Sequence, residues 1–183
     1  MASTNDNLFT SFPNMEQVLR FPHKIGAKGA QICVEFTGGR LQRLSLERSV
    51  LNIAPENGNR IAAWFEWLSL FEAAKPSAQW ELLAPDGTAF QRAVWRGLLE
   101  VGWGKRISYG ALAGMLGRPQ AVRAVASAVA ANPIALLIPC HRIVRADGQA
   151  GGYRWGRGLK ETLLELEAGR RTWGELLWQD SLT

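Results

Sequence analysis

The chain has 183 residues, of which 47% are hydrophobic and eight are tryptophan, so it can form one compact domain or two small ones around a real core. Its only cysteines, Cys33 and Cys140, exclude a disulfide framework, and their spacing matches no zinc site. No apolar run has membrane-spanning length, and the first ten residues lack the apolar core of a secretory signal. We therefore expect a reducing, intracellular location in the cytoplasm, with no membrane contact.

The net charge of +5 is concentrated in one part of the chain. Residues 1–85 carry eight Lys or Arg and eight Asp or Glu, whereas residues 92–160 carry eleven basic and two acidic residues. A local excess of nine positive charges is typical of a surface that binds a polyanion, although a solvated basic surface without a partner would give the same count.

The N-terminal half has the pattern of a small antiparallel sheet. A strand is expected near residues 18–21, and the alternation of residues 32–36 and 41–46 around Gly38-Gly39 predicts a hairpin. We interpret Cys33, within this hairpin, as a structural residue. Asn59 can cap a helix over residues 59–74 that packs on the sheet, and residues 80–83 are expected to form a short strand.

A turn at residues 84–87 is the expected boundary between an N-terminal domain, residues 1–85, and a C-terminal domain, residues 86–183. The run Thr88-Ala89-Phe90-Gln91 is a capping box, which predicts a helix from there to about residue 100. Ser108 can cap a helix over residues 109–116, followed by a turn at residues 117–119 and a second helix over residues 120–131. This order predicts a helix-turn-helix.

The second of these helices is rich in alanine and valine, and Arg123 is its only long charged side chain. A helix that reads base edges in the major groove would carry several polar side chains, which this one lacks. Its small residues suit close docking in a narrow groove with Arg123 projecting from it. Packing of the small residues inside the protein is the alternative interpretation.

The apolar run of residues 134–138 leads directly to Pro139-Cys140-His141-Arg142. A buried strand that ends in a thiol beside a histidine and an arginine can present a nucleophile, because thiolate is the reactive form of cysteine and neighbouring positive charge favours it. A buried cysteine that only packs is the alternative. Adjacent residues of an extended chain face opposite sides, so His141 could act on Cys140 only through a water or across a tight bend.

The last segments combine a loop and a helix. Residues 151–158 are rich in glycine yet carry Tyr153 and Trp155, as expected of a mobile loop with aromatic faces. A helix is expected over residues 159–168, ending at Gly169, with Glu161 in its first turn, where the helix dipole favours a carboxylate.

The C-terminal part of the chain resembles the O6-alkylguanine-DNA alkyltransferase family, also called methylated-DNA–protein-cysteine methyltransferase. The motifs that carry the resemblance run in unbroken order from Gly87 to about Gly169, and the N-terminal half matches only in general shape. They are Gly87-Thr88-Ala89-Phe90-Gln91 with Val94-Trp95, Ile107-Ser108-Tyr109, Ala121-Val122-Arg123-Ala124-Val125, Ala131-Asn132-Pro133, Ile138-Pro139-Cys140-His141-Arg142 and Gly152-Tyr153-Arg154-Trp155-Gly156.

The resemblance implies a catalytic role for four residues. Cys140 matches the alkyl acceptor, and His141 matches the base that activates it through a bridging water. Glu161 matches the carboxylate that orients this histidine. Asn132 matches the residue that links the recognition helix to the active-site segment.

The resemblance also implies contacts with DNA and with the substrate. Arg123 matches the finger that fills the gap left by a flipped base, and Tyr109 the residue that displaces the target phosphate. Ser108, Ala124 and Arg118 are further candidates for DNA contact. The expected substrate pocket contains Tyr153, Arg154, Trp155 and Gly156.

The expected fold is α+β: an N-terminal antiparallel sheet with a packed helix, and a mostly helical C-terminal domain with the helix-turn-helix and the active-site loop. The expected activity is transfer of an alkyl group from O6-alkylguanine in double-stranded DNA to Cys140, once per molecule, with O4-alkylthymine as a second candidate substrate. No cofactor or metal is expected, and the protein should bind the minor groove as a monomer, with cooperative binding left open. A lesion-binding module without activity and a cysteine hydrolase are the alternatives.

Overall fold

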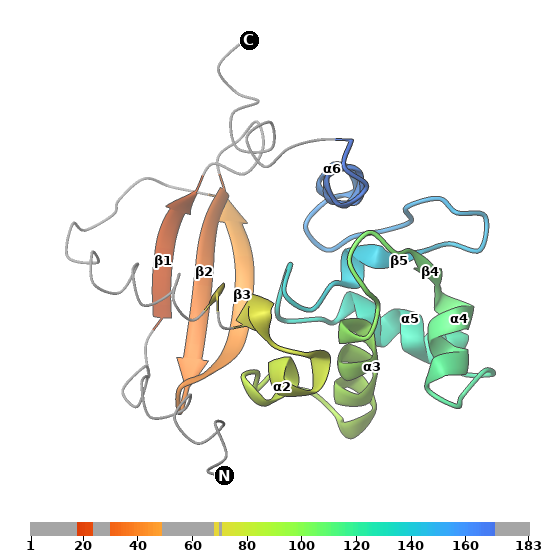
Figure 1. Ribbon diagram of the computed structural model, residues 1–183, viewed down its shortest axis with the longest axis horizontal. Helices are drawn as coiled ribbons and strands as arrows, with labels where there is room; N and C mark the ends of the chain where they lie inside the picture. Colours follow the sequence, from red (N-terminus) through yellow and green to blue (C-terminus); the bar gives the residue numbers. More distant parts are fainter. Residues whose placement is uncertain (1–17, 24–29, 49–67, 70, 171–183) are drawn as a thin grey trace.

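The computed structural model describes residues 18–23, 30–48, 68–69 and 71–170 of the chain. A three-stranded antiparallel sheet lies on one side, and a mainly helical part built from residues 76–167 lies on the other (Figure 1). The predicted α+β class is therefore confirmed.

The sheet contains β1 (Val18–His23), β2 (Ala30–Thr37) and β3 (Arg40–Arg48), paired in that order. The predicted hairpin is confirmed, and its turn residues Gly38 and Gly39 have φ of +54° and +74°. Positive φ at both central residues matches the twist of a two-residue hairpin, and glycine adopts it without steric cost. Cys33 is buried in β2, as its structural interpretation requires.

Two predictions for the linking segment have different outcomes. The helix expected over residues 59–74 lies largely outside the described residues, although residues 68–69 and 71–73 are helical. The strand expected over residues 80–83 is wrong, because this segment begins in α2 (Pro76–Glu81) and only Leu83 makes a bridge, with Leu41 of β3. Pro76 stands at the start of α2, where its missing N–H costs no helical hydrogen bond.

The helical part follows the predicted order closely. Its elements are α3 (Ala89–Leu99), β4 (Ile107–Ser108), α4 (Tyr109–Met115), α5 (Val122–Ala130), the 3-10 turn η2 (Cys140–Arg142), β5 (Ile143–Val144) and α6 (Arg157–Glu167). The capping box is confirmed, since the Thr88 N–H donates to Gln91 Oε1 at 2.8 Å and the Gln91 N–H donates to Thr88 Oγ1 at 3.2 Å. Ser108 caps α4 by accepting from the Ala111 N–H at 3.1 Å.

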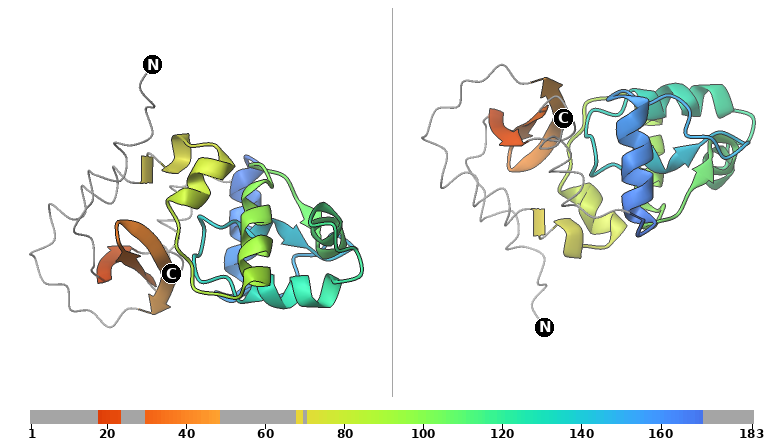
Figure 2. Two further views of the ribbon diagram at one scale, coloured as in Figure 1. Left: turned by 90° about the horizontal axis from the view of Figure 1, so that it is seen from below. Right: turned by 90° about the horizontal axis from the view of Figure 1, so that it is seen from above.

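Trp95 organises the packing of α3 against α5. Its ring is 1% exposed, and its indole Nε1–H donates to the Ala128 carbonyl of α5 at 2.7 Å. A Cβ built on Gly87 would lie 2.5 Å from this ring, so only glycine allows the chain to pass there before α3 begins. Figure 2 shows α6 running across the helical part, between the N-terminal sheet and α4.

The two parts are joined by backbone pairing at the edge of the sheet. The Leu44 N–H of β3 donates to the Pro133 carbonyl at 3.1 Å, and the Ala135 N–H donates back to the Leu44 carbonyl at 2.9 Å. Residues 133–135 lie directly before the Cys140 turn, so the N-terminal sheet supports the segment that leads to the candidate nucleophile.

Among the described helices, none is both long and apolar enough to cross a membrane. The described residues also contain no group of three or more His, Cys, Asp or Glu side chains that could hold a metal ion.

We predict that Trp95→Phe lowers the free energy of unfolding by about 1–3 kcal/mol, because it leaves a buried carbonyl without its donor and removes packed volume. Urea unfolding measures this loss. Trp103→Phe is the matched control, since the Trp103 side chain is 59% exposed and its replacement should change stability by less than about 0.5 kcal/mol. Equal losses in the two variants would contradict the role of Trp95.

Candidate active site

The segment before Cys140 is bent rather than extended. The buried strand expected over residues 134–138 is wrong: only Ile134 makes a bridge, with Leu44, and the chain then turns, with Leu136 at φ +66°. The Cys140 N–H donates to the Ile138 carbonyl at 2.7 Å, and Cys140 opens the 3-10 turn. The tight bend that sequence geometry required for cooperation between Cys140 and His141 is therefore present.

Asn132 holds this bend together. Its side chain is 1% exposed, and its Nδ2 donates to the carbonyls of Ile134 at 3.1 Å and Ile138 at 2.9 Å and to Cys140 Sγ at 3.1 Å. Its Oδ1 accepts from the Ile134 N–H at 3.0 Å. One side chain therefore joins the end of α5 to both arms of the bend and to the sulfur itself.

The Cys140 thiol is 4% exposed, and its surroundings act on it in opposite directions. Burial raises the pKa of the thiol, because a thiolate loses solvation there. The Asn132 hydrogen bond and the nearby charge of Lys160 lower the pKa part of the way back. The resting thiol is therefore protonated at neutral pH and needs a base to become a nucleophile.

His141 has the geometry of that base. Its Nε2 lies 2.8 Å from Glu167 Oε1, and burial lowers the pKa of His141, so the ring is neutral near pH 7. An ionised carboxylate only accepts hydrogen bonds, so Nε2 carries the proton and Nδ1 carries a lone pair. Nδ1 is buried and has no hydrogen-bond partner among the described residues. The ring is thus oriented by Glu167 with an open proton-accepting nitrogen.

The partner of His141 is Glu167, and the expectation that Glu161 fills this role is wrong. Glu161 is exposed and forms an ion pair with Arg157 at 2.8 Å. Helix α6 begins at residue 157, so Glu161 also lies beyond its first turn. The two carboxylates are six positions apart, about 240° around a helix, and therefore cannot share a face.

Glu167 is further fixed by Arg142. The guanidinium donates to both carboxylate oxygens, with Nε at 3.1 and 3.0 Å and Nη2 at 2.9 Å, and also bonds to the Val101 carbonyl. Burial alone would raise the pKa of Glu167, but hydrogen bonds from His141 and Arg142 outweigh it and lower the pKa to about 2. Trp103 covers Arg142, with the guanidinium 5.6 Å from the ring centre.

Lys160 is a residue of the site that the sequence reasoning missed. It is 1% exposed, and its Nζ donates to the Ile143 carbonyl at 2.6 Å. Burial lowers the pKa of Lys160, and Cys140 acts in the opposite direction. The spacing along the helix could have revealed it. Lys160 and Glu167 are seven residues apart with leucines between them, which places two opposite charges on the buried face of α6.

A pocket of about 430 Å³ opens onto Cys140. It brings Cys140 and Tyr109 together with three of the four expected substrate-pocket residues, and it adds Val129 and Ala130 at the end of α5, which the sequence reasoning did not assign to the site. Gly156 is not among its lining residues; it has φ +101° and precedes α6. The lining residues are Tyr109, Val129, Ala130, Cys140, Gly152, Tyr153, Arg154 and Trp155.

Aromatic side chains form one wall of this pocket. Tyr153 and Trp155 pack edge to face with ring centres 5.3 Å apart, and the Arg154 guanidinium lies 5.8 Å from the Trp155 ring centre. The Tyr153 hydroxyl makes no hydrogen bond of normal geometry among the described residues. The pKa of Tyr153 is raised well above its usual value, first by burial and then by Cys140, as expected of a hydroxyl that lies close to the sulfur.

Tyr109, at the start of α4, also lies beside the thiol. Burial raises its pKa, the Cys140 charge raises it further, and Arg145 acts in the opposite direction. A pocket with stacking surfaces and a few convergent polar groups is typical of a small-molecule or nucleobase site.

The other expected DNA-binding residues lie outside the pocket. Arg123 and Ala124 are exposed on α5, while Val125, Ala128 and Val129 face the core. Arg118 is exposed in the turn between α4 and α5, with its guanidinium 5.5 Å from the Phe90 ring centre. The packing interpretation thus holds for one face of α5, while the opposite face is open and its docking in a groove stays a prediction.

Comparison with known proteins supports this site. Residues 89–169 match the family model described as 6-O-methylguanine DNA methyltransferase, DNA binding domain. The structure of Mycobacterium tuberculosis OGT in complex with DNA aligns with a TM-score of 0.63 and 31% identity, over 87% of this chain and 97% of that one. The chain belongs to the 6-O-methylguanine DNA methyltransferase family.

Curated relatives in this family are more similar over a shorter region. The bifunctional transcriptional activator/DNA repair enzyme Ada of Escherichia coli is 56% identical over 82 residues, which is 45% of this chain and 23% of Ada. A methylated-DNA–protein-cysteine methyltransferase of Methanosarcina acetivorans is 48% identical over 85 residues, 46% of this chain and 54% of that protein. The match thus spans from about a quarter to about half the length of these relatives.

We predict that Glu167→Gln destabilises the protein, whereas Glu161→Gln, with the same change in charge, does not. The folded pKa of Glu167 is lowered from 4.5 to about 2, so its contribution is complete above about pH 4.5 and is lost as the pH falls towards 2. A shift of this size corresponds to on the order of 3 kcal/mol.

Urea unfolding at several pH values between 2 and 7 measures the effect. The Glu167→Gln protein should be less stable at pH 7 and should lose less stability than wild type on acidification. A Glu161→Gln protein that behaved like Glu167→Gln would contradict the assignment.

Proposed function

We propose that this protein is a DNA repair alkyltransferase that moves the alkyl group of O6-alkylguanine in duplex DNA onto Cys140, once per molecule. The observation that carries the proposal is the buried thiol of Cys140 at the floor of an aromatic-lined pocket, beside a histidine that Glu167 orients. Family membership adds support, because relatives over residues 89–169 are named as methylated-DNA–protein-cysteine methyltransferases.

The first step is removal of the thiol proton. His141 is neutral near pH 7, and its open Nδ1 can accept this proton through a bridging water, while Glu167 stabilises the imidazolium that forms. Asn132 and Lys160 favour the resulting thiolate, by hydrogen bonding and by charge. The raised thiol pKa then means that Cys140 is activated only when this proton transfer occurs.

The second step is a direct displacement. The thiolate attacks the alkyl carbon, a C–S bond forms, and the bond from that carbon to guanine O6 breaks with its electron pair remaining on the guanine, which then takes up a proton. The product thioether is stable, because the alkyl carbon on a neutral thioether sulfur is a poor electrophile, and the alkyl group therefore stays on Cys140. One turnover per molecule follows from this chemistry.

Access to the lesion requires base flipping, because a stacked base cannot enter the pocket of Cys140 and O6 lies on the major-groove edge, away from the proposed minor-groove contact. Helices α4 and α5, joined by the turn at Arg118, form the proposed helix-turn-helix, and the exposed face of α5 suits docking in the minor groove. Arg123 would occupy the gap left by the flipped base, and Tyr109 would displace the target phosphate. Ser108, which caps α4, and exposed Ala124 would lie against the DNA backbone.

The flipped base would enter the pocket lined by Tyr153, Arg154 and Trp155, where aromatic faces stack on it, and Gly156 would let the loop turn into α6. O4-alkylthymine is a second candidate substrate, because it also carries an alkyl group on an exocyclic oxygen. We propose that the protein acts as a monomer on DNA in the cytoplasm.

The decisive experiment is the intact mass of the protein after incubation with a duplex that carries one O6-methylguanine. Wild type should gain one methyl group and stop at one equivalent. Cys140→Ser should bind the duplex and gain nothing, while Cys33→Ser, the matched control, should react like wild type. Transfer by the Cys140→Ser protein would contradict the proposal. If the wild-type protein bound the lesion without any gain in mass, a lesion-binding module would be favoured.

Arg123→Gln should slow transfer from duplex DNA at least tenfold and leave the slow transfer from free O6-methylguanine base unchanged, because only the duplex needs a flipped base. Arg96→Gln removes the same charge from an exposed position on α3 and serves as the control. Quenched-flow mass measurements give both rates. Equal rates on duplex for wild type and Arg123→Gln would contradict the finger role.

A further inference from the structure

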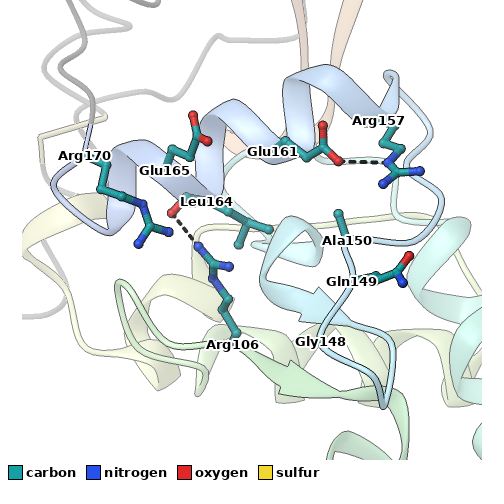
Figure 3. A pocket seen from close by; sticks show the side chains of 9 residues that line it. All are labelled: Arg106, Gly148, Gln149, Ala150, Arg157, Glu161, Leu164, Glu165 and Arg170. Carbon is teal, nitrogen blue, oxygen red and sulfur yellow. Dashed lines mark hydrogen bonds and ion pairs between the residues drawn. The ribbon is translucent and has the colours of Figure 1, made fainter.

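A second pocket of about 210 Å³ lies along α6, on a face next to the one that carries Lys160 and Glu167. One face of α6 forms one wall, with residues on successive turns of the helix, and the loop of residues 148–150 forms another wall (Figure 3). Arginines from three separate segments enter it. Its lining residues are Arg106, Gly148, Gln149, Ala150, Arg157, Glu161, Leu164, Glu165 and Arg170.

Hydrogen bonds fix two of these arginines in place, Arg106 through its side chain and Arg170 through its backbone. Arg106 directly precedes β4, which pairs with β5, and its Nη2 donates to the Leu164 carbonyl at 3.1 Å. Arg170 follows the helix end at Gly169, where the Gly169 N–H bonds to the Leu166 carbonyl and the Arg170 N–H bonds to the Glu165 carbonyl. These two bonds with φ of +68° at Gly169 are a Schellman motif, which sets the direction of Arg170.

Figure 3 shows the guanidinium groups of Arg106 and Arg170 pointing to the same end of the pocket, while the Glu165 carboxylate points away from both. Within the described part of the chain, neither guanidinium forms an ion pair. The other acidic lining residue, Glu161, lies at the far end and is already paired with Arg157. The Arg106 end therefore carries two positive charges that the pocket does not neutralise.

Two converging guanidinium groups repel each other unless an anion lies between them. Arg106 uses one N–H for the Leu164 carbonyl and retains further donors, and a guanidinium matches the geometry of phosphate oxygens in a bidentate manner. We propose that the Arg106–Arg170 end of this pocket is a phosphate-binding site. The phosphate comes either from the backbone of bound DNA, a source that rests on the proposed function, or from a free phosphate ion.

The position of the pocket connects it to the active site. Residues 148–150 line the phosphate pocket, and residues 152–155 of the same loop line the pocket of Cys140. An anion held by Arg106 and Arg170 would therefore lie in the same pocket as the start of the loop that carries Tyr153 and Trp155, at the end of the pocket away from that loop (Figure 3).

The test is a calorimetric titration of the full-length protein with inorganic phosphate. Sodium chloride is adjusted during the titration to keep the ionic strength constant. Wild type should bind phosphate in a saturable manner, and Arg106→Gln and Arg170→Gln should each bind at least tenfold more weakly. Arg43→Gln is the matched control, since it removes one exposed arginine from the N-terminal sheet. Absence of saturable binding to wild type, or equal binding by all four proteins, would overturn the proposal.

The dependence of affinity for an unmodified duplex on salt concentration then identifies the source of the phosphate. If the site holds a DNA phosphate, Arg106→Gln and Arg170→Gln should each lower the slope of log affinity against log salt by about one more than Arg43→Gln does. Equal slopes in the three variants, together with loss of phosphate binding in two of them, would assign the site to a free phosphate ion. Because the phosphate titration contains no DNA, failure of the proposed repair function would not affect its result.

Discussion

The side-chain amide of Asn132 is the constraint on which the candidate site depends. The segment after it must turn sharply to bring Cys140 next to His141, and a bent buried chain leaves backbone groups without the partners that a strand or helix would supply. Asn132 provides those partners to the Ile134 and Ile138 carbonyls and also reaches the sulfur. Both carbonyls also accept from backbone N–H groups, but the Ile134 N–H donates to Asn132 Oδ1, so removing this amide would leave that buried N–H without its acceptor at a cost of roughly 1–3 kcal/mol.

Around this bend the protein buries ionisable groups that an apolar core would exclude. Lys160, His141 and Glu167 are each less than 10% exposed, and each forms a hydrogen bond with a polar partner. Arg142 supplies the positive charge that keeps Glu167 ionised, and an ionised Glu167 keeps the His141 proton on Nε2. The protonation states of Glu167 and His141 thus follow from one another, while burial keeps the thiol neutral at rest.

The features that could be predicted from the sequence are those that depend on neighbouring residues. The capping box at Thr88, the two-glycine hairpin turn and the cap at Ser108 are satisfied by groups within three positions, so the local pattern was sufficient. The adjacency of Cys140 and His141 in the chain also made this pair the candidate nucleophile and base, roles that stay predictions.

The errors concern choices that distant contacts decide. Residues 134–138 are apolar as a strand would be, but they bend because Leu44 and Asn132 pair with them from elsewhere in the chain. Glu161 was assigned to His141 from the resemblance to the family, whereas the helical phase relative to the core decides which carboxylate reaches His141. Lys160 was missed for the same reason, since its burial depends on how α6 packs.

The pairing between β3 and residues 133–135 has a consequence for how the molecule comes apart. The expected division at residue 85 separates the sheet from the helices along the sequence, yet the bridge of Leu44 with Ile134 crosses between them. A fragment that began at residue 86 would leave the Ala135 N–H without its acceptor and the nucleophile's segment without one of its supports. The sheet and the active-site bend should accordingly melt as a single cooperative unit, even though the chemistry belongs to the helical part alone.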